Sequence, residues 1–233
     1  MISIQTTDLT KRYGTHTSLY QLNLSISRGT VYCLLGQNGA GKTTTINLLS
    51  GFTRPSSGTV HINGQEVRPD DPAVRKAVAY IPEVVQLYDN LSGMENLRFF
   101  SSLAGYRYKP AELSVFLREV GLQEEAHEHR LGTYSKGMRQ KVGIAIALAK
   151  HAEVILMDEP TSGLDPKATA EFTRICKELA AAGKTIFMAT HDIFNAVNAG
   201  TQIGIMKQGI LVHTVATSAI TADELQQLYL ETI

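Results

Sequence analysis

Apolar residues alternate with polar residues near the start of the chain. Between residues 22 and 26 every second side chain is apolar, which is typical of a strand with one buried face. Residues 59–62 lead into Asn63-Gly64, a dipeptide that suits the positive φ angles of a tight hairpin turn. These patterns predict an antiparallel β portion in the N-terminal part of the chain.

Three short segments are apolar on both faces, namely residues 31–35, 154–157 and 185–189. A segment that favours a helix follows each of them. Parallel strands covered by helices show this pattern, because both faces of their sheet are buried. We therefore predict an α/β fold with these three strands at the centre of the sheet.

Helix boundaries follow from capping residues. Ser92 and Glu95 form a predicted capping box, and Asp165 is a predicted N-cap followed by Pro166 at the first helical position. Between about residues 83 and 149 the chain is predicted to be almost wholly helical, with strands before and after this stretch. The order indicates a helical subdomain at about residues 83–150, inserted into the α/β core of a single domain that spans residues 1–233.

Composition narrows the class of protein. The 233 residues carry 22 Lys and Arg against 22 Asp and Glu, and this balance argues against a broad nucleic-acid-binding surface. The longest wholly non-polar run, residues 142–149, is far shorter than the roughly 20 residues that span a bilayer. The N-terminus lacks the pattern of a secretory signal. Cys33 and Cys176 have no metal-ligand spacing, so we interpret both as core residues.

A glycine-rich loop follows the first predicted parallel strand. It fits the P-loop pattern G-x-x-x-x-G-K-[ST] with the residues Gly36, Gln37, Asn38, Gly39, Ala40, Gly41, Lys42 and Thr43. The glycines let successive amides turn toward phosphate oxygens at the start of a helix. Lys42 adds a cation for the outer phosphates, Thr43 offers a hydroxyl to Mg²⁺, and Thr44 completes the predicted nucleotide-binding set. The alternative is a glycine-rich turn with an exposed lysine.

Two adjacent acids follow the second predicted parallel strand. Asp158 is placed to hold Mg²⁺ directly or through water, and Glu159 is placed to polarise an attacking water as a general base. Adjacent acids elsewhere usually mark a solvated turn, but here an apolar strand precedes them and Pro160 ends it. The sequence therefore predicts binding of a polyphosphate with Mg²⁺ at this edge of the sheet.

With these motifs in order, the chain resembles the nucleotide-binding subunit of ATP-binding-cassette (ABC) transporters over essentially its whole length. Residues 134–138 resemble the family's signature motif, usually LSGGQ, and residues 162–165 resemble its D-loop. His191 resembles the switch histidine, and Tyr13 resembles the aromatic residue that stacks on adenine. The resemblance implies a P-loop NTPase fold with a RecA-like core, together with ATPase activity.

The resemblance also implies that two subunits share each nucleotide site. Ser135 and Gly137 of one subunit would close over ATP held by its neighbour, in a homodimer or heterodimer. His191 would contact the γ-phosphate, and Asp165 would cross the interface. Simpler interpretations stay open, because Ser135 suits an N-cap, Tyr13 a half-buried strand position and His191 the start of a helix.

The chain departs from the family pattern at two places. The family usually has Gln after the strand at residues 78–81, where this chain has Glu83; Glu83 is an oxygen donor and stays a predicted metal contact. The signature carries Lys136 for Gly and Met138 for Gln. These features look most like the bacterial exporter branch, in which the ATPase and the membrane subunits are separate chains.

A subunit of this kind implies a separate transmembrane permease and a peripheral position on the cytoplasmic face of the membrane. The resemblance implies permease contact around residues 83–94, and an exposed apolar patch is one interpretation of four nearby residues, Leu87, Tyr88, Phe99 and Phe100. For Phe99 and Phe100 a core position is an equally good interpretation.

Two other functions compete with a transporter subunit. A soluble ABC-type ATPase switch in translation or DNA repair is disfavoured, because the chain has one set of motifs and no sustained heptads. A different P-loop NTPase is disfavoured by the ordered signature, D-loop and His191. No nucleic-acid partner is expected.

Overall fold

The computed structural model describes residues 1–69 and 71–233. Its strands are β1 (Ile2–Tyr13), β2 (His16–Ser27), β3 (Val31–Leu35), β4 (Ser57–Ile62), β5 (Gln65–Glu66), β6 (Val78–Ile81), β7 (Val154–Asp158), β8 (Thr185–Thr190), β9 (Gln202–Lys207) and β10 (Ile210–Ala216). Its α-helices are α1 (Lys42–Leu49), α2 (Pro72–Ala77), α3 (Gly93–Leu103), α4 (Pro110–Glu119), α5 (Lys136–Ala149), α6 (Pro166–Ala181), α7 (Ile193–Ala199) and α8 (Ala222–Thr232). Short 3₁₀ turns are Glu124–Ala126, Leu131–Thr133 and Thr217–Ala219.

The N-terminal sheet is antiparallel, with the strand order β2-β1-β4-β5. Strands β4 and β5 are joined at Asn63 and Gly64, whose φ angles of 51° and 81° fit a hairpin turn. Leu22, Leu24 and Ile26 of β2 are buried. The predicted antiparallel portion and its hairpin are therefore confirmed.

The second sheet has the strand order β10-β9-β3-β8-β7-β6. Strands β9, β3, β8, β7 and β6 are parallel, and β10 joins β9 as an antiparallel edge strand. The three predicted parallel strands thus lie side by side as β3, β8 and β7. The predicted mixed α/β fold is confirmed.

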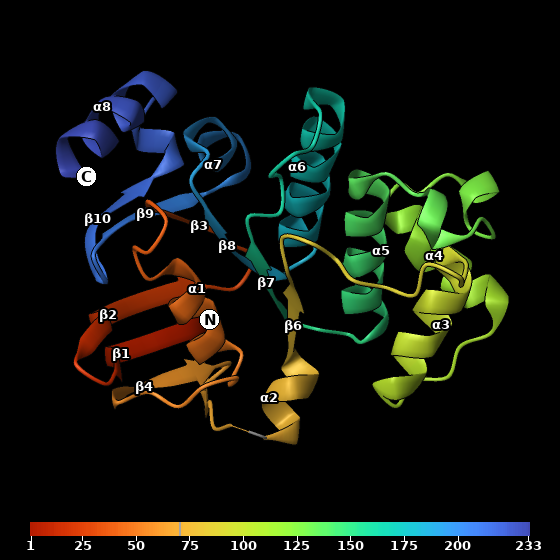
Figure 1. Cartoon of the computed structure of the whole chain (residues 1–233), viewed down its shortest axis with the longest axis horizontal. Helices are drawn as coiled ribbons and strands as arrows, with labels where there is room; N and C mark the ends of the chain where they lie inside the picture. The colour runs from red at the N-terminus through yellow and green to blue at the C-terminus, as the bar shows by residue number, and fades with distance from the viewer. Residues whose placement is uncertain (70) are drawn as a thin grey trace.

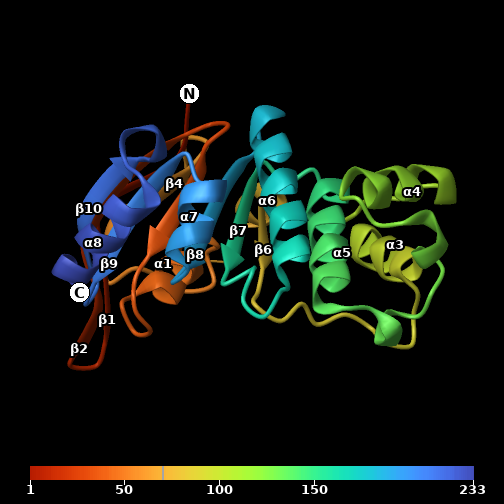
Figure 2. The same cartoon turned by 90° about the horizontal axis from the view of Figure 1, so that it is seen from above.

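Helices cover both faces of this sheet (Figures 1 and 2). Residues on alternate positions of β3 belong to two separate apolar clusters, Tyr32 with Ile46 of α1 and Cys33 with Cys176 of α6. Helix α1 contacts strands of both sheets, whereas α6 and α7 pack on the other face of β3. The interpretation of both cysteines as buried core residues is confirmed.

Helices α3, α4 and α5 lie together at one end of the molecule, between β6 and β7 in the chain (Figures 1 and 2). Residues 82–92 precede α3 without forming a helix, which differs from the prediction. The buried Asn96 side chain explains the difference, because it accepts from the Tyr88 amide at 2.9 Å and donates to the Tyr88 carbonyl at 3.0 Å. These bonds satisfy backbone groups that a helix would otherwise pair.

The predicted helix starts are present. Ser92 and Glu95 form a capping box at α3, and the Asp165 carboxylate caps α6 by accepting from the Ala168 amide at 2.8 Å. None of the helices in the described parts of the chain is both long and apolar enough to cross a membrane.

Candidate nucleotide-binding site

The P-loop connects the buried strand β3 to the start of α1. Gly39 and Gly41 have φ angles of 81° and 106°, which side chains disfavour. A Cβ atom at Gly41 would also lie 2.7 Å from the Ser18 carbonyl oxygen of β2. Glycine is therefore required at residue 41 by the backbone and by its neighbour, and the loop bends there into the first turn of α1.

The ammonium group of Lys42 lies inside the bend of this loop. Its Nζ donates to the carbonyl oxygens of Gly36 at 2.6 Å and Gln37 at 3.3 Å, and it lies 3.5 Å from Oε1 of Glu159. The Lys42 side chain is only 6% exposed. A buried cation is held here by two carbonyls and one carboxylate, beside amides at a helix N-terminus, which is an arrangement suited to an anion.

Thr43 and Asp158 place two oxygen ligands next to each other. The Thr43 hydroxyl donates to Oδ2 of Asp158 at 2.9 Å. The pKa of Asp158 is raised mainly by burial, while the Thr43 hydrogen bond opposes the rise and the charges of Glu159 and Glu83 add to it. A hydroxyl and a carboxylate in contact match the oxygen ligands that Mg²⁺ takes beside substrate phosphates, so these residues fit the ion.

Glu159 follows β7 in a left-handed backbone conformation, with φ at 43°. Such a conformation is unfavourable for a residue with a side chain and is concentrated at functional sites. Oε2 of Glu159 lies 2.9 Å from Nδ1 of His191 and accepts from the His191 amide at 3.3 Å. The turn therefore brings the acid that follows β7 against the histidine that follows β8.

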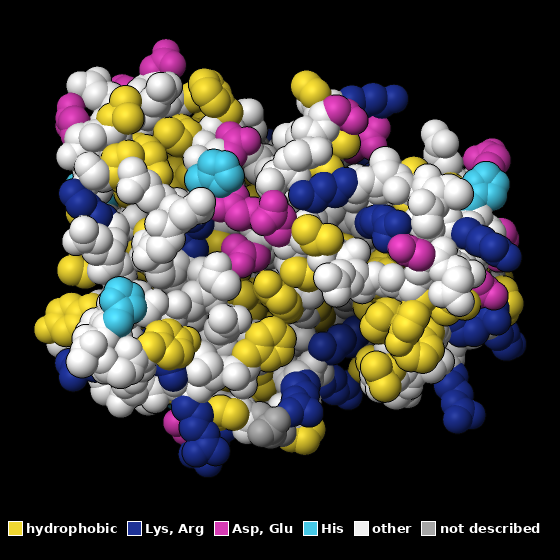
Figure 3. Space-filling model, viewed as in Figure 1, with side chains coloured by type: hydrophobic (Ala, Val, Ile, Leu, Met, Phe, Trp, Pro, Cys, Tyr) yellow, Lys and Arg dark blue, Asp and Glu magenta, His cyan; other side chains and the backbone are white. Residues whose placement is uncertain are grey.

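A pocket of about 250 Å³ lies where these groups meet. Its lining, which defines the P-loop pocket, is Ser18, Gln37, Asn38, Gly39, Gly41, Lys42, Thr43, Thr44, Glu83, Asp158 and Glu159. Figure 3 shows acidic side chains and a histidine gathered near the middle of the face that it views. The structure thus brings six of the eight predicted P-loop residues, Thr44, both adjacent acids and Glu83 to one pocket. Gly36 and Ala40 are not part of its lining.

Ser18 lines this pocket, although no pattern in the sequence predicts it as a site residue. Its hydroxyl lies 2.7 Å from the Thr44 hydroxyl of α1. Ser18 lies in β2, far from the P-loop in the chain, and a lone serine in a strand carries no motif. Only the packing of β2 against α1 brings the two hydroxyls together.

Glu83 is held at the edge of the pocket by two other motifs. Its Oε1 accepts from the Ser162 hydroxyl at 2.8 Å and lies 3.8 Å from Nζ of Lys136. Glu83 is therefore in contact with Ser162 and Lys136, which belong to the segments that resemble the D-loop and the signature motif.

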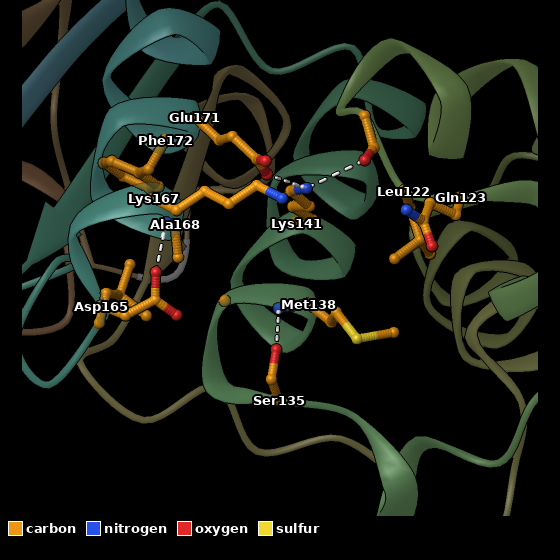
Figure 4. Close-up of a pocket in the computed structure, with 13 residues that line it drawn as sticks. Leu122, Gln123, Ser135, Met138, Lys141, Asp165, Lys167, Ala168, Glu171 and Phe172 are labelled. Carbon is orange, nitrogen blue, oxygen red and sulfur yellow. Dashed lines mark hydrogen bonds and ion pairs between the residues drawn. The ribbon is translucent and has the colours of Figure 1, made fainter.

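Ser135, Gly137 and Asp165 line a different pocket, the signature pocket, of about 270 Å³ between α5 and α6. Ser135 is the N-cap of α5 and accepts from the Met138 amide at 3.3 Å. Lys141 spans the same pocket, with Nζ 2.7 Å from Glu171 and 2.9 Å from the Gly121 carbonyl (Figure 4). These three predicted residues are not brought to the P-loop pocket of their own chain.

Tyr13 ends β1 and is half exposed, with Nζ of Lys11 4.9 Å from the centre of its ring. It does not line the P-loop pocket. Lys11 lies over the Tyr13 ring, which is half exposed. The predicted stacking of this ring on adenine stays a prediction.

Comparison with known proteins identifies the family. The model of the family described as ABC transporter matches residues 19–162. Bacitracin transport ATP-binding protein BcrA of Bacillus licheniformis is 38% identical over 213 residues, which cover 91% of this chain and 69% of that protein. Daunorubicin/doxorubicin resistance ATP-binding protein DrrA of Streptomyces peucetius is 33% identical over 212 residues, covering 90% and 64% of the two chains.

Solved structures agree with these relatives. A structure described as the ATP binding subunit of an ABC transporter has a TM-score of 0.84 and 30% identity, and the match covers 98% of both chains. A dimeric ATP-binding cassette in a post-hydrolysis state, bound to ADP and Pi, has a TM-score of 0.80 and 27% identity, covering 92% of this chain and 98% of that one. The protein described here therefore belongs to the ABC transporter family, as one of its ATP-binding subunits.

Proposed function

We propose that the chain hydrolyses ATP in the P-loop pocket. The observation that carries the proposal is that Thr43, Asp158 and Glu159 line one pocket. Thr43 donates to Asp158, and His191, which is outside the lining, contacts Glu159. The first pair is suited to a metal ion and the second to proton transfer. A P-loop that ends in the buried Lys42 supplies the phosphate-binding part.

Each group has a separate role in this proposal. The P-loop amides and Lys42 bind the phosphates, and Thr43 and Asp158 hold Mg²⁺, which neutralises phosphate charge when bound. Glu159 accepts the proton of the attacking water. His191 orients the Glu159 carboxylate through its ring and its amide.

The test of hydrolysis is phosphate release by the purified chain. We expect release from ATP that requires Mg²⁺ and stops when a chelator removes it. Absence of phosphate release at every protein concentration, with ATP still bound, would argue against hydrolysis by this chain alone.

A second subunit completes the site in this proposal. Ser135 and Gly137 open α5, so their amides and hydroxyl form an anion-binding helix start that faces the signature pocket. Dimeric structures of similar cassettes support pairing of two such chains. We infer that ATP bound by one chain is covered by Ser135 and Gly137 of another.

We infer that the permease docks in a groove between the sheet that carries β6 and the helices α3 and α5. The groove has a volume of about 720 Å³, and it extends from α2 and β6 to α3. Its apolar lining includes Phe52, Phe100 and Leu103, and its basic lining includes Lys76 and Lys150. This combination fits an amphipathic permease segment that carries carboxylates.

Aromatic side chains extend this groove toward residues 83–94, where the resemblance places the permease contact. Tyr88 stacks against Phe100, with ring centroids 6.1 Å apart, and both contact Phe99 edge to face. Figure 3 shows hydrophobic side chains gathered over α3. Tyr88 and Phe99 are exposed, which favours the patch interpretation for both, whereas Leu87 packs against the core.

A cysteine cross-link tests the docking site. Both natural cysteines are fully buried, so Leu103→Cys, at a side chain that is 75% exposed, would provide a selectively reactive thiol. We expect this variant, copurified with its membrane partner, to cross-link to an apolar protein. Leu230→Cys on α8, at 62% exposure, is the matched control. Equal cross-linking of both variants would count against the groove.

The names of three relatives support a direction of transport. The relatives described above are named for bacitracin transport and for daunorubicin/doxorubicin resistance. Another relative is named as a Nod factor export protein. We propose that this chain powers an exporter and lies on the cytoplasmic face of the membrane through its permease. These names give no support to a role in translation or DNA repair.

A further inference from the structure

The two charged departures from the family pattern lie against each other in the structure. Glu83 stands where the family usually has Gln, and Lys136 stands where the signature usually has Gly. Oε1 of Glu83 and Nζ of Lys136 are 3.8 Å apart. Each departure introduces a charge, and the two charges are opposite, so each compensates for the other.

Helix α5 also fixes the backbone that carries Glu83. The buried Gln140 donates from Nε2 to the Glu83 carbonyl at 3.2 Å, and Arg139 pairs with Asp89 at 2.7 Å. Lys136, Arg139 and Gln140 are spaced i, i+3 and i+4, so they share one face of α5. With the backbone held at the carbonyl of residue 83, the Glu83 carboxylate is the part that can change partners.

A cation that enters the P-loop pocket would attract the Glu83 carboxylate. Glu83 lines the P-loop pocket with Asp158 and Glu159, and its charge contributes to raising the pKa of Asp158. Lys42 pairs with Glu159, whereas Lys136 pairs with Glu83. Three carboxylates and the Lys42 ammonium therefore line the pocket where Thr43 and Asp158 fit Mg²⁺. The Lys136 ammonium lies outside that lining and reaches only the Glu83 carboxylate. A divalent ion there would draw Glu83 away from Lys136.

We propose that Lys136 is a positioning residue that competes with Mg²⁺ for the Glu83 carboxylate, and so sets how much Mg²⁺ the site needs. The inference rests on the proposed function, because it requires Mg²⁺ beside ATP in the P-loop pocket. While Mg²⁺ is bound, Glu83 turns to the ion. When Mg²⁺ leaves, Lys136 recaptures Glu83 and favours release.

A double-mutant cycle tests this competition. Lys136→Gln, Glu83→Gln and the double variant are each made in a Glu159→Gln background, which is expected to bind ATP without turnover. Binding of a fluorescent ATP analogue is then followed as Mg²⁺ is added. We expect Lys136→Gln to lower the Mg²⁺ concentration at half-maximal binding by about 1.5- to fivefold, the range that exposed ion pairs are worth. With Gln at residue 83, the same change should have no effect.

Two controls keep the result interpretable. Lys136→Arg keeps the charge and should restore the original Mg²⁺ midpoint. Arg118→Gln breaks a surface ion pair with Glu124, 2.9 Å apart, and should leave the midpoint unchanged. Each variant is checked for folding by thermal melting, and neither Glu83 nor Lys136 is buried.

The outcomes are distinct. If Lys136→Gln shifts the Mg²⁺ midpoint equally with Glu and with Gln at residue 83, the proposal is overturned, because Lys136 would then act on the phosphates or through its general field. If Lys136→Gln shifts the midpoint with neither residue at position 83, the proposal is overturned as well. If the parent protein binds the analogue without any need for Mg²⁺, the proposal is overturned, because there is then no Mg²⁺ requirement for Lys136 to set. If the parent chain releases no phosphate from ATP with Mg²⁺ present, the proposed function fails instead.

Discussion

We expect replacement of Glu159 by Gln to separate catalysis from nucleotide binding. The amide oxygen of Gln can still accept from the His191 ring and amide, which lie 2.9 and 3.3 Å from Oε2 of Glu159. Lys42 loses a carboxylate at 3.5 Å but keeps the carbonyls of Gly36 and Gln37. The geometry of the P-loop is therefore retained, and the ability to accept a proton is lost.

The expected size of the effect follows from that loss. Removal of a general base lowers a rate by about 10²- to 10⁴-fold, which corresponds to about 2.7–5.5 kcal/mol of activation free energy. ATP affinity should be equal or higher, because a negative charge beside the phosphates has been removed. Steady-state phosphate release and equilibrium titration with a fluorescent ATP analogue measure the two quantities.

The control is Glu153→Gln, which makes the same chemical change before the opposite end of β7, at an exposed side chain. Its phosphate release should match that of the parent chain. If Glu159→Gln keeps more than about a tenth of the parent rate, the assignment of the base is wrong, since the expected loss begins at about a hundredfold. Loss of ATP binding would instead show that Glu159 is needed for the shape of the pocket.

Four further changes test other parts of the site. Lys42→Ala should weaken ATP binding by about 1.5–3 kcal/mol, the value of hydrogen bonds to a charged group, in an equilibrium titration. Tyr13→Ala should weaken it by about 1–3 kcal/mol if the ring stacks on adenine, and unchanged affinity would refute the stacking. Asp158→Asn should raise the melting temperature at pH 7, because the raised pKa of Asp158 means that its ionised form destabilises the fold. This gain in melting temperature should disappear as the pH falls to about 4, near the ordinary pKa of Asp. Ser92→Ala should lower the free energy of unfolding by about 1 kcal/mol in a denaturant titration, because it removes the capping box of α3, and ATP affinity should not change.

Local chemistry made much of the fold predictable. The apolar segments at β3, β7 and β8, the Asn63-Gly64 turn and the caps at Ser92 and Asp165 each depend on neighbouring residues in the chain. Each of these patterns involves residues that are close in the chain, so the folded structure keeps the local conformation that the pattern predicts. The loop at residues 82–92 was not predictable in this way, because its shape depends on bonds from the Asn96 side chain.

The site shows the same division. The P-loop and the adjacent acids are motifs, so sequence predicts that they meet near the ends of parallel strands. Ser18, which contacts Thr44, and Lys136, which contacts Glu83, depend on the packing of separate elements. The left-handed backbone at Glu159 is also unpredicted, since Glu carries no preference for it.

The separation of the P-loop pocket from the signature pocket has a kinetic consequence. The two pockets share no lining residue among the described parts of the chain. If catalysis needs both, the rate law for free chains is second order in protein, and the rate per chain falls in proportion on dilution. Two chains held side by side on one permease would follow first-order kinetics instead. Unassembled copies would then consume little ATP, so assembly itself limits the energy that the cell spends.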